Sequence, residues 1–135
     1  MKLVLFAASL LTATAAVAAS PYDEPYSIIT VDTLKSADPL LRRVIVNRVD
    51  DVSITTVDNK AVVAPGMHKV TLDLPPRVGF HQATQYDMAL ETKPCTRYYV
   101  AAKLDSPALQ SWTPVVRSEE PIGECMRKFQ IAKAK

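Results

Sequence analysis

Between residues 27 and 117 the chain consists of short runs rich in β-branched and aromatic residues, and a turn signal follows each run. About six to seven such runs can be counted, which is the pattern of an antiparallel sandwich or a partly open barrel. Helical periodicity does not extend beyond about two turns anywhere in this region. The sequence therefore predicts an all-β fold, and we expect a small antiparallel β-sandwich.

Two of these runs, residues 85–92 and 96–104, alternate between apolar and polar side chains. This alternation is typical of an antiparallel strand with one buried face. In the second run Tyr98 falls on the apolar face and Tyr99 on the outward face. The run 44–46, Val-Ile-Val, is continuously apolar, which predicts a strand that is buried on both faces or nearly so.

Proline and glycine mark several of the expected turns. Pro65–Gly66 predicts a type II turn in a hairpin-like segment, because proline presets φ and glycine accepts the positive φ that this turn needs. His68 follows on the apolar side, where we expect a core or rim residue with satisfied hydrogen bonds rather than a ligand. Pro114 favours an edge position or a bulge for the run 113–117, because proline cannot donate to the strand ladder.

Residues 1–19 have the pattern of a cleaved secretory signal peptide: one lysine, an apolar run and a small-residue cleavage region. The apolar run is shorter than the roughly 20 residues that span a bilayer. We therefore expect a mature chain that begins near Ala19 or Ser20, has no transmembrane segment and is periplasmic or secreted. Its length suits one domain rather than two.

The mature chain divides into three expected parts. Residues 20–39 form an N-terminal arm with an edge strand, 40–125 form the β-sandwich domain, and 126–135 form a basic tail. The tail carries four basic residues and no acid. We expect a solvated, frayed terminus, with attraction to an anionic envelope surface as the alternative. Export and the absence of a basic, aromatic-lined stripe elsewhere argue against nucleic acid as a partner.

Cys95 and Cys125 are the two cysteines of the chain. In an exported protein they allow one intramolecular pairing, and an oxidising compartment lets that bond persist. A disulfide closing this loop contributes roughly 3–4 kcal/mol to stability in the chain-entropy model. A metal site or a redox pair is the alternative, but the spacing is far from a C-x-x-C motif. We therefore expect a structural disulfide.

The sequence contains no recognisable catalytic motif. There is no G-x-S-x-G, and three glycines leave little material for a strained nucleophile turn. His68 and His81 are the two histidines, and neither lies in a spacing that preorganises a metal site. We expect no enzymatic activity and no cofactor. A small metal-binding protein, with His68 and His81 meeting across the 75–84 connection, is a weaker alternative.

Aromatic residues supply the expected binding surface, which comprises Trp112, Tyr99, Phe80 and His81. Such side chains bind sugars, peptides and proteins through amphipathic contact area. Phe80 and His81 lie in the proline- and glycine-rich connection 75–84, and loops on a β scaffold often carry binding residues. The alternatives are that Trp112 packs in the core and that the connection is a plain crossover between two sheets, with Phe80 closing the end of the core.

The expected function is that of a non-enzymatic exported β-sandwich protein of the cell envelope. We expect a protein-interaction or structural module that binds an envelope protein. A carbohydrate- or lipid-binding module, with an envelope glycan as one ligand, is the alternative from a different class.

The segments VNRVDD, VAPGMHKVTLDL, CTRYYVAAKL and WTPVVRSEEPIGEC together resemble a group of small, uncharacterised exported proteins of Gram-negative bacteria. VAPGMHKVTLDL also resembles a strand of PEGA-type and carboxypeptidase-regulatory-like β modules. The resemblance covers roughly residues 44–125 and implies a small β-sandwich of cell-envelope proteins without a transferable catalytic residue. PEGA modules usually occur within larger proteins, whereas this chain has a single domain with a disulfide.

Overall fold

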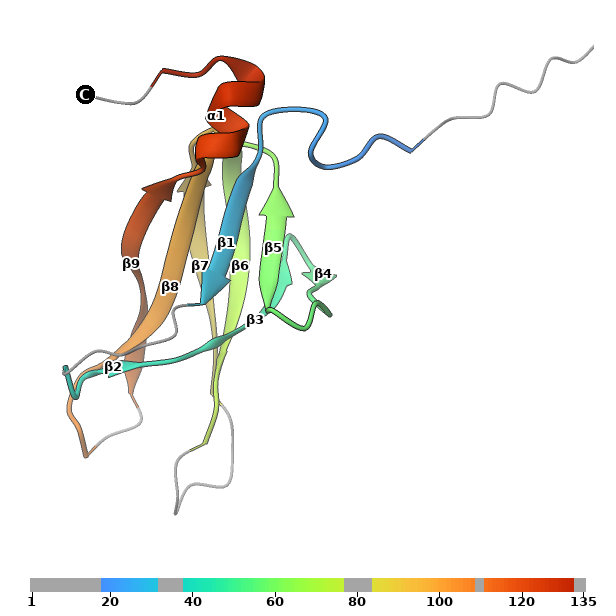
Figure 1. The fold of residues 1–135 in the computed structure, drawn as a ribbon. Helices are drawn as coiled ribbons and strands as arrows, with labels where there is room; N and C mark the ends of the chain where they lie inside the picture. The colour runs from blue at the N-terminus through green and yellow to red at the C-terminus, as the bar shows by residue number, and fades with distance from the viewer. Residues whose placement is uncertain (1–17, 32–37, 77–83, 109–110, 133–135) are drawn as a thin grey trace, which may run out of the picture.

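The computed structural model of the chain describes residues 18–31, 38–76, 84–108 and 111–132. Within these ranges the chain forms two sheets and one short helix (Figure 1). The elements are β1 (Ser27–Val31), β2 (Leu41–Arg42), β3 (Ile45–Val49), β4 (Val52–Ser53), β5 (Lys60–Val63), β6 (Gly66–Leu74), β7 (Thr84–Thr92), β8 (Thr96–Leu104), β9 (Trp112–Pro121) and α1 (Gly123–Phe129). The predicted all-β sandwich is confirmed. Residues 1–17 of the expected signal peptide lie outside the described ranges.

The first sheet, called the β8 sheet, has the order β2-β8-β1-β5, and β9 also pairs with β8. β1 and β2 pair with different parts of β8, whereas β9 pairs with β8 along its whole length. β1 was expected at an edge, but it lies between β5 and β8. The reason is that both of its faces are covered: Ile29 is fully buried between the sheets, and Ile28 is buried on the opposite face. β1 runs parallel to β8, with Ile29 beside Tyr98, so the sandwich is not purely antiparallel.

The second sheet, called the β6 sheet, has the order β4-β3-β6-β7 and is antiparallel throughout. The expectation of a strand buried on both faces at residues 44–46 is wrong. Val44 and Val46 are fully buried, whereas Ile45 is 46% exposed. β3 therefore has one buried face and one solvent face, and it continues through the polar residues Asn47 and Arg48 to Val49.

Pro65–Gly66 does not close a hairpin. β5 pairs with β1 in the β8 sheet, whereas β6 pairs with β3 and β7 in the other sheet, so this dipeptide carries the chain from one sheet to the other. Gly66 has a φ of 136°, which L residues rarely adopt. The connection 75–83 was given a crossover between sheets as one alternative. β6 and β7, which it links, are paired neighbours in the same sheet, so it is not a crossover.

The main core lies between the two sheets and consists of inward-facing side chains from both. Its largest fully buried members are Tyr98, Ile29, Leu72 and Leu104. The predicted inward face of 96–104 is confirmed, because Tyr98 and the alternate positions after it are buried, whereas Ala101 on the outward face is buried as well. The run 113–117 belongs to the longer strand β9, which lies at an edge of the β8 sheet as Pro114 predicted.

A second, smaller apolar cluster lies on the outer face of the β8 sheet, under α1. It contains Tyr26, Ile28, Cys95, Ile122 and Cys125, and the α1 residues Met126 and Phe129 pack against it. The predicted disulfide between Cys95 and Cys125 is present. The tail expected from residue 126 therefore begins later, because residues 126–129 belong to α1 and to the folded unit.

Backbone hydrogen bonds support the disulfide from both sides. Cys95 has a positive φ of 53° and its N–H donates to the carbonyl oxygen of Tyr26 at 2.8 Å. The Ile122 N–H donates to the carbonyl oxygen of Cys95 at 2.8 Å. These bonds tie the start of β1, the start of β8 and the start of α1 together. Over the described ranges, the structure contains no helix with the length and apolar character needed to cross a membrane.

Candidate functional site

Trp112 lies in the core rather than on an exposed binding surface. Its side chain is 4% exposed, and its ring packs edge-to-face against Tyr86 with the centroids 5.2 Å apart. The indole Nε1–H donates to the Thr84 hydroxyl at 2.7 Å. Trp112 is therefore not part of an accessible contact surface, because its side chain is buried and its one polar group is hydrogen-bonded to Thr84.

Tyr99 lies on the outward face of β8, as its register predicted, and is half-buried there. Its hydroxyl donates to Glu120 Oε2 at 2.9 Å, and Arg97 Nη1 lies 4.0 Å from the same oxygen. Phe80 and His81 lie outside the described residues. Of the four expected binding residues, Tyr99 is thus the one that the structure places on an outer face.

His68 is a satisfied rim residue, as its register predicted. Its side chain is 11% exposed, and its Nδ1 and Nε2 each lie 2.6 Å from an acceptor, Asp50 Oδ2 and the Ala64 carbonyl oxygen. A doubly protonated ring donates to both partners at once. Among the described residues, no group of three or more His, Cys, Asp or Glu side chains is arranged to hold a metal ion.

Asp50 completes this contact and was not singled out from the sequence. The hydrogen bond from His68 lowers the pKa of the Asp50 carboxyl below its usual value, and the backbone N–H of Lys69 lowers it further. The position could not be recognised because it depends on positive φ angles of 50° at Asp50 and 65° at Asp51. These angles turn the carboxylate back toward β6.

The most promising binding site is a pocket of about 420 Å³ at α1 and the outer face of the β8 sheet. We call it the tyrosine pocket, because Tyr22 and Tyr26 of the N-terminal arm line it. Its remaining lining residues are Ile28, Lys60, Arg97, Ile122, Glu124, Cys125 and Lys128. Pockets of this size are typical of small-molecule sites.

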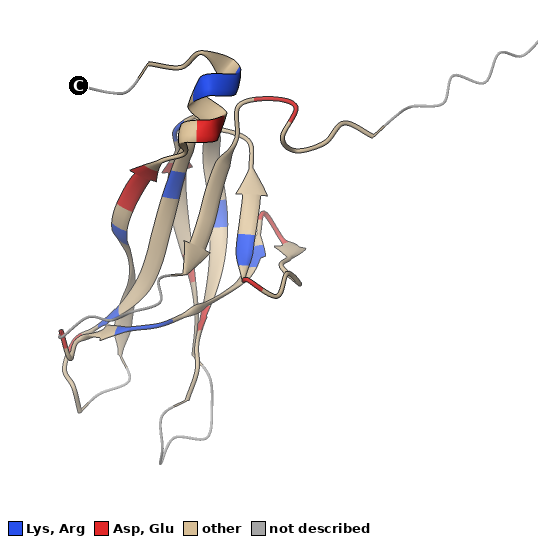
Figure 2. Ribbon diagram, viewed as in Figure 1, with Lys and Arg blue, Asp and Glu red and all other residues tan. Residues whose placement is uncertain are grey.

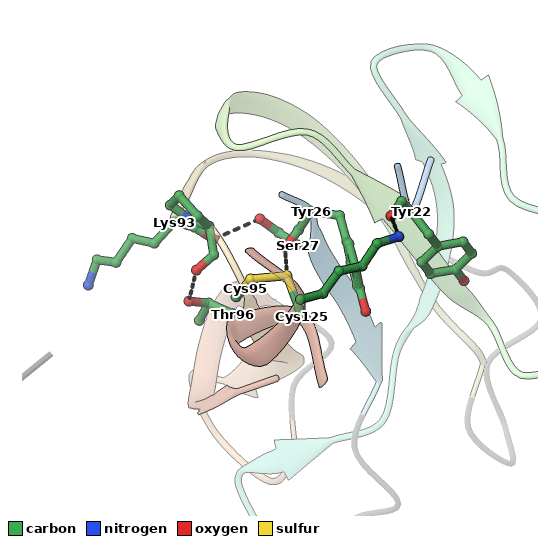
Figure 3. The surroundings of a disulfide bond; sticks show 9 residues. Tyr22, Tyr26, Ser27, Lys93, Cys95, Thr96 and Cys125 are labelled. Atoms are coloured by element: carbon green, nitrogen blue, oxygen red, sulfur yellow. Dashed lines mark hydrogen bonds between the residues drawn. A yellow bond between two sulfur atoms is a disulfide. The ribbon is translucent and has the colours of Figure 1, made fainter. Parts of the chain in front are cut away.

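Tyr22 is positioned by one contact within the arm and by one contact with α1. The ring of Tyr22 packs edge-to-face against that of Tyr26, with the centroids 5.0 Å apart. The Lys128 ammonium donates to the carbonyl oxygen of Tyr22 at 2.6 Å, which joins the arm to α1. Figure 3 shows Tyr26 next to the Cys95–Cys125 disulfide, which fixes α1 to the sheet, and Tyr22 on the side of Tyr26 away from it.

The two tyrosines have different roles in the pocket. Tyr26 is buried, and this burial, followed by the negative charge of Glu124, raises the pKa of its phenol above the usual value. The Tyr26 hydroxyl therefore keeps its proton at neutral pH and remains a hydrogen-bond donor. Tyr22 is 40% exposed, so part of its ring is accessible to a ligand.

Two cations of the tyrosine pocket, Lys60 and Arg97, have carboxylate partners. Lys60 Nζ lies 2.9 Å from Asp58 Oδ2, and this hydrogen bond raises the pKa of Lys60. Arg97 is close to Glu120. Figure 2 shows both signs of charge distributed over β8, β9 and α1. The pocket thus offers charged donors and acceptors side by side, which suits a neutral or weakly charged ligand with many hydroxyl groups.

Sequence reasoning missed this pocket because its walls come from distant parts of the chain. Residues 20–26 were read as a connecting arm and Lys128 as part of a frayed tail, and these two segments meet only through the fold. The repeated Pro-Tyr pairs, Pro21–Tyr22 and Pro25–Tyr26, were the available signal. They place two aromatic rings close together in the sequence, and the first pair lies in a turn in which the Asp23 N–H donates to the Ser20 carbonyl oxygen at 3.0 Å.

Comparisons with models of protein families, with curated proteins and with solved structures gave no match to this chain. The resemblance to PEGA-type and carboxypeptidase-regulatory-like modules therefore stays an expectation.

Proposed function

We propose that this chain is a non-enzymatic, exported binding protein of the bacterial cell envelope and that it recognises a saccharide in the tyrosine pocket. The observation that carries the proposal is the composition of that pocket. An accessible Tyr22 ring shares the pocket with Tyr26 and with the charged side chains of Lys60 and Glu124. Sugar rings combine apolar C–H faces, which pack on aromatic rings, with hydroxyl groups that need donors and acceptors.

A saccharide fits the pocket better than the other expected partners do. Protein partners usually bind over about 800 Å² of surface per side and use exposed aromatic anchors. Trp112, the expected anchor, is buried. A lipid chain fits poorly because the pocket is lined by four charged side chains, Lys60, Arg97, Glu124 and Lys128.

The proposal includes export of the chain and a role without catalysis. The signal-peptide pattern of residues 1–19 and the Cys95–Cys125 disulfide both suit an oxidising compartment. Among the described residues, the two cysteines and His68 are engaged in structural contacts. Both cysteines are in the disulfide, and both ring nitrogens of His68 are hydrogen-bonded.

The test is a titration of the isotopically labelled protein with soluble peptidoglycan fragments and lipopolysaccharide-derived oligosaccharides, followed by NMR. We expect chemical-shift changes around Tyr26, Arg97 and α1. Tyr22→Ala should weaken the binding about fivefold, because a stacked ring is worth about 1 kcal/mol. It should hardly change the melting temperature, because Tyr22 is partly exposed and its contact with Lys128 uses the backbone.

Met67→Ala is the control, because Met67 is an exposed apolar residue on β6, in the opposite sheet. It should leave saccharide binding unchanged. Binding that survives Tyr22→Ala at full strength would refute the site. If no saccharide shifts the spectrum, and a photo-crosslinker at position 22 captures an envelope protein instead, the ligand class is wrong and the expected protein partner replaces it.

A further inference from the structure

The exposed edges of the two sheets are protected to different degrees. In the described ranges the edge strands are β2 and β4, with two residues each, β5 with four, and β7 and β9. β9 carries Pro114 and Pro121, and its pairing with β8 shifts register between Tyr99 and Val100. Short strands, prolines and bulges are the devices by which proteins prevent pairing with a further strand.

The β3 edge of the β6 sheet is blocked by a side chain. Beyond the short β4, the Asn59 amide occupies the backbone of Val46. Asn59 Oδ1 accepts from the Val46 N–H at 2.8 Å, and Asn59 Nδ2 donates to the Val46 carbonyl oxygen at 2.9 Å. These two bonds imitate a neighbouring strand, so this edge has no free pair of backbone groups at Val46.

β7, at the opposite edge of the same sheet, has none of these protections. It is nine residues long, contains no proline and no lysine, and pairs with β6 without a register shift from Gly66–Thr92 to Leu74–Thr84. Its inward-facing side chains are incompletely covered, since Tyr86 is 50% exposed and Met88 is only partly buried. The edge therefore presents both free backbone groups and uncovered apolar surface.

We propose that β7 pairs with β7 of a second copy of this chain, antiparallel and centred on Met88, so that the two β6 sheets become one continuous sheet. In this register all nine residues of the strand are paired. Tyr86 lies opposite Leu90 of the second copy, and Gln85 lies opposite Glu91. Asp87 lies opposite Ala89. Aromatic–aliphatic and amide–carboxylate pairs across strands are favourable.

The charges on β7 disfavour the two nearest registers that keep the same faces. Centring the pair on Ala89 would place Asp87 opposite Glu91, and centring it on Asp87 would place that residue opposite its own copy; like charges directly opposite each other destabilise a sheet. A shift by one residue would exchange the two faces of the strand. The charge of Asp87 is partly compensated within its own chain, because Thr71 Oγ1 donates to its carboxylate at 2.7 Å and Lys69 Nζ lies 3.9 Å from it.

Three substitutions of Ala89 test this pairing, because they differ mainly in the charge of the new side chain. Its side chain is exposed, so substitution does not disturb the core. Ala89→Glu places a carboxylate opposite Asp87 of the second copy, whereas Ala89→Lys places an ammonium there, and Ala89→Gln is the neutral control of the same shape as Glu. The dimerisation constant of each is measured by sedimentation velocity on the full exported chain with its disulfide formed.

We expect a concentration-dependent dimer for the native chain and for Ala89→Gln. Ala89→Glu should raise the dimer dissociation constant at least about tenfold relative to Ala89→Gln, and Ala89→Lys should lower it. Salt should reduce both differences, because it screens exposed charges. A native chain that stays monomeric up to about 200 µM, a concentration at which even weak strand pairing is populated, would overturn the proposal. Equal dimerisation of the Glu and Gln variants would show that a different surface is used.

Discussion

Asp50 joins the β3–β4 turn to β6 through three hydrogen bonds. Its N–H donates to the Lys69 carbonyl oxygen at 2.8 Å, its Oδ1 accepts from the Lys69 N–H at 2.9 Å, and its Oδ2 lies 2.6 Å from His68 Nδ1. Because the two bonds to the side chain are stronger when the carboxylate is ionised, the contact depends on pH. It is the clearest example in this chain of a single residue that fixes the position of a turn.

Asp50 should make the stability of the fold depend on acid. In the folded state its pKa is lowered by His68 and by the Lys69 N–H, so the unfolded chain binds the proton more readily. The resulting stabilisation is fully present above the unfolded carboxyl pKa of about 3.9 and is lost as the pH falls through the lowered folded value. We expect Asp50→Asn to lower the melting temperature at pH 6 and to differ little from the native chain near pH 2.

The control is Asp51→Asn, since Asp51 shares the turn but its carboxylate contacts the exposed Lys69 ammonium at 3.0 Å. Exposed pairs of this kind contribute little to stability. Asp51→Asn should therefore reproduce the native pH profile between pH 2 and 6. Identical profiles for Asp50→Asn and Asp51→Asn would contradict the role given to Asp50.

Trp112 should behave spectroscopically as a core residue. Because the ring is buried and its N–H is bonded to Thr84, we expect blue-shifted emission that iodide does not quench, and a red shift on unfolding. Trp112→Ala should cost about 3–5 kcal/mol of unfolding free energy, as large-to-small substitutions of buried aromatic residues do. Emission near that of free tryptophan in the native protein would show that the ring is exposed after all.

At the scale of elements, the sequence predicted which residues form several strands better than it predicted which strands are neighbours. The faces of 96–104 followed from alternation, because the pleat makes every second side chain point the same way. The position of β1 and the change of sheet at Pro65–Gly66 depend on long-range pairing, which a local pattern does not encode.

α1 was missed for a related reason. Seven residues are too few to show helical periodicity, and a helix this short is not stable on its own in water. Its stability comes from packing Met126 and Phe129 on the outer cluster and from the bond to Cys95. The tyrosine pocket, which needs α1 as a wall, was therefore also not predictable from local sequence.

Removing the disulfide should destabilise the protein and release α1. We expect Cys95→Ala and Cys125→Ala to lower the unfolding free energy by about the same amount, roughly 3–4 kcal/mol, because either change opens the same loop. Denaturant unfolding monitored by circular dichroism measures the loss. The double variant should match the single ones, and a reductant should lower the stability of the native chain without affecting the double variant. Unchanged stability in both single variants would show that the bond does not support the fold.

At the scale of the whole molecule, the strands differ in how many sides are paired. In the described ranges β1, β8, β3 and β6 have neighbours on both sides, whereas β5, β7 and β9 have a neighbour on one. The interior strands also supply most of the fully buried side chains, among them Tyr98, Ile29 and Leu72. Opening an interior strand therefore requires separating the two sheets, whereas an edge strand can open alone.

Native-state hydrogen exchange should reveal this order. We expect the amides of β1, β8 and β6 to exchange only through global unfolding, with one common free energy, and those of β5 and β9 to exchange through smaller openings. Amides of β7 that point toward β6 should be protected, whereas the alternate amides, which point to the open edge, should exchange rapidly in dilute solution. Raising the protein concentration should protect these alternate amides if β7 pairs with a second copy, and should leave those of β9 unchanged. Uniform exchange across edge and interior strands would contradict the pairing pattern described for the two sheets.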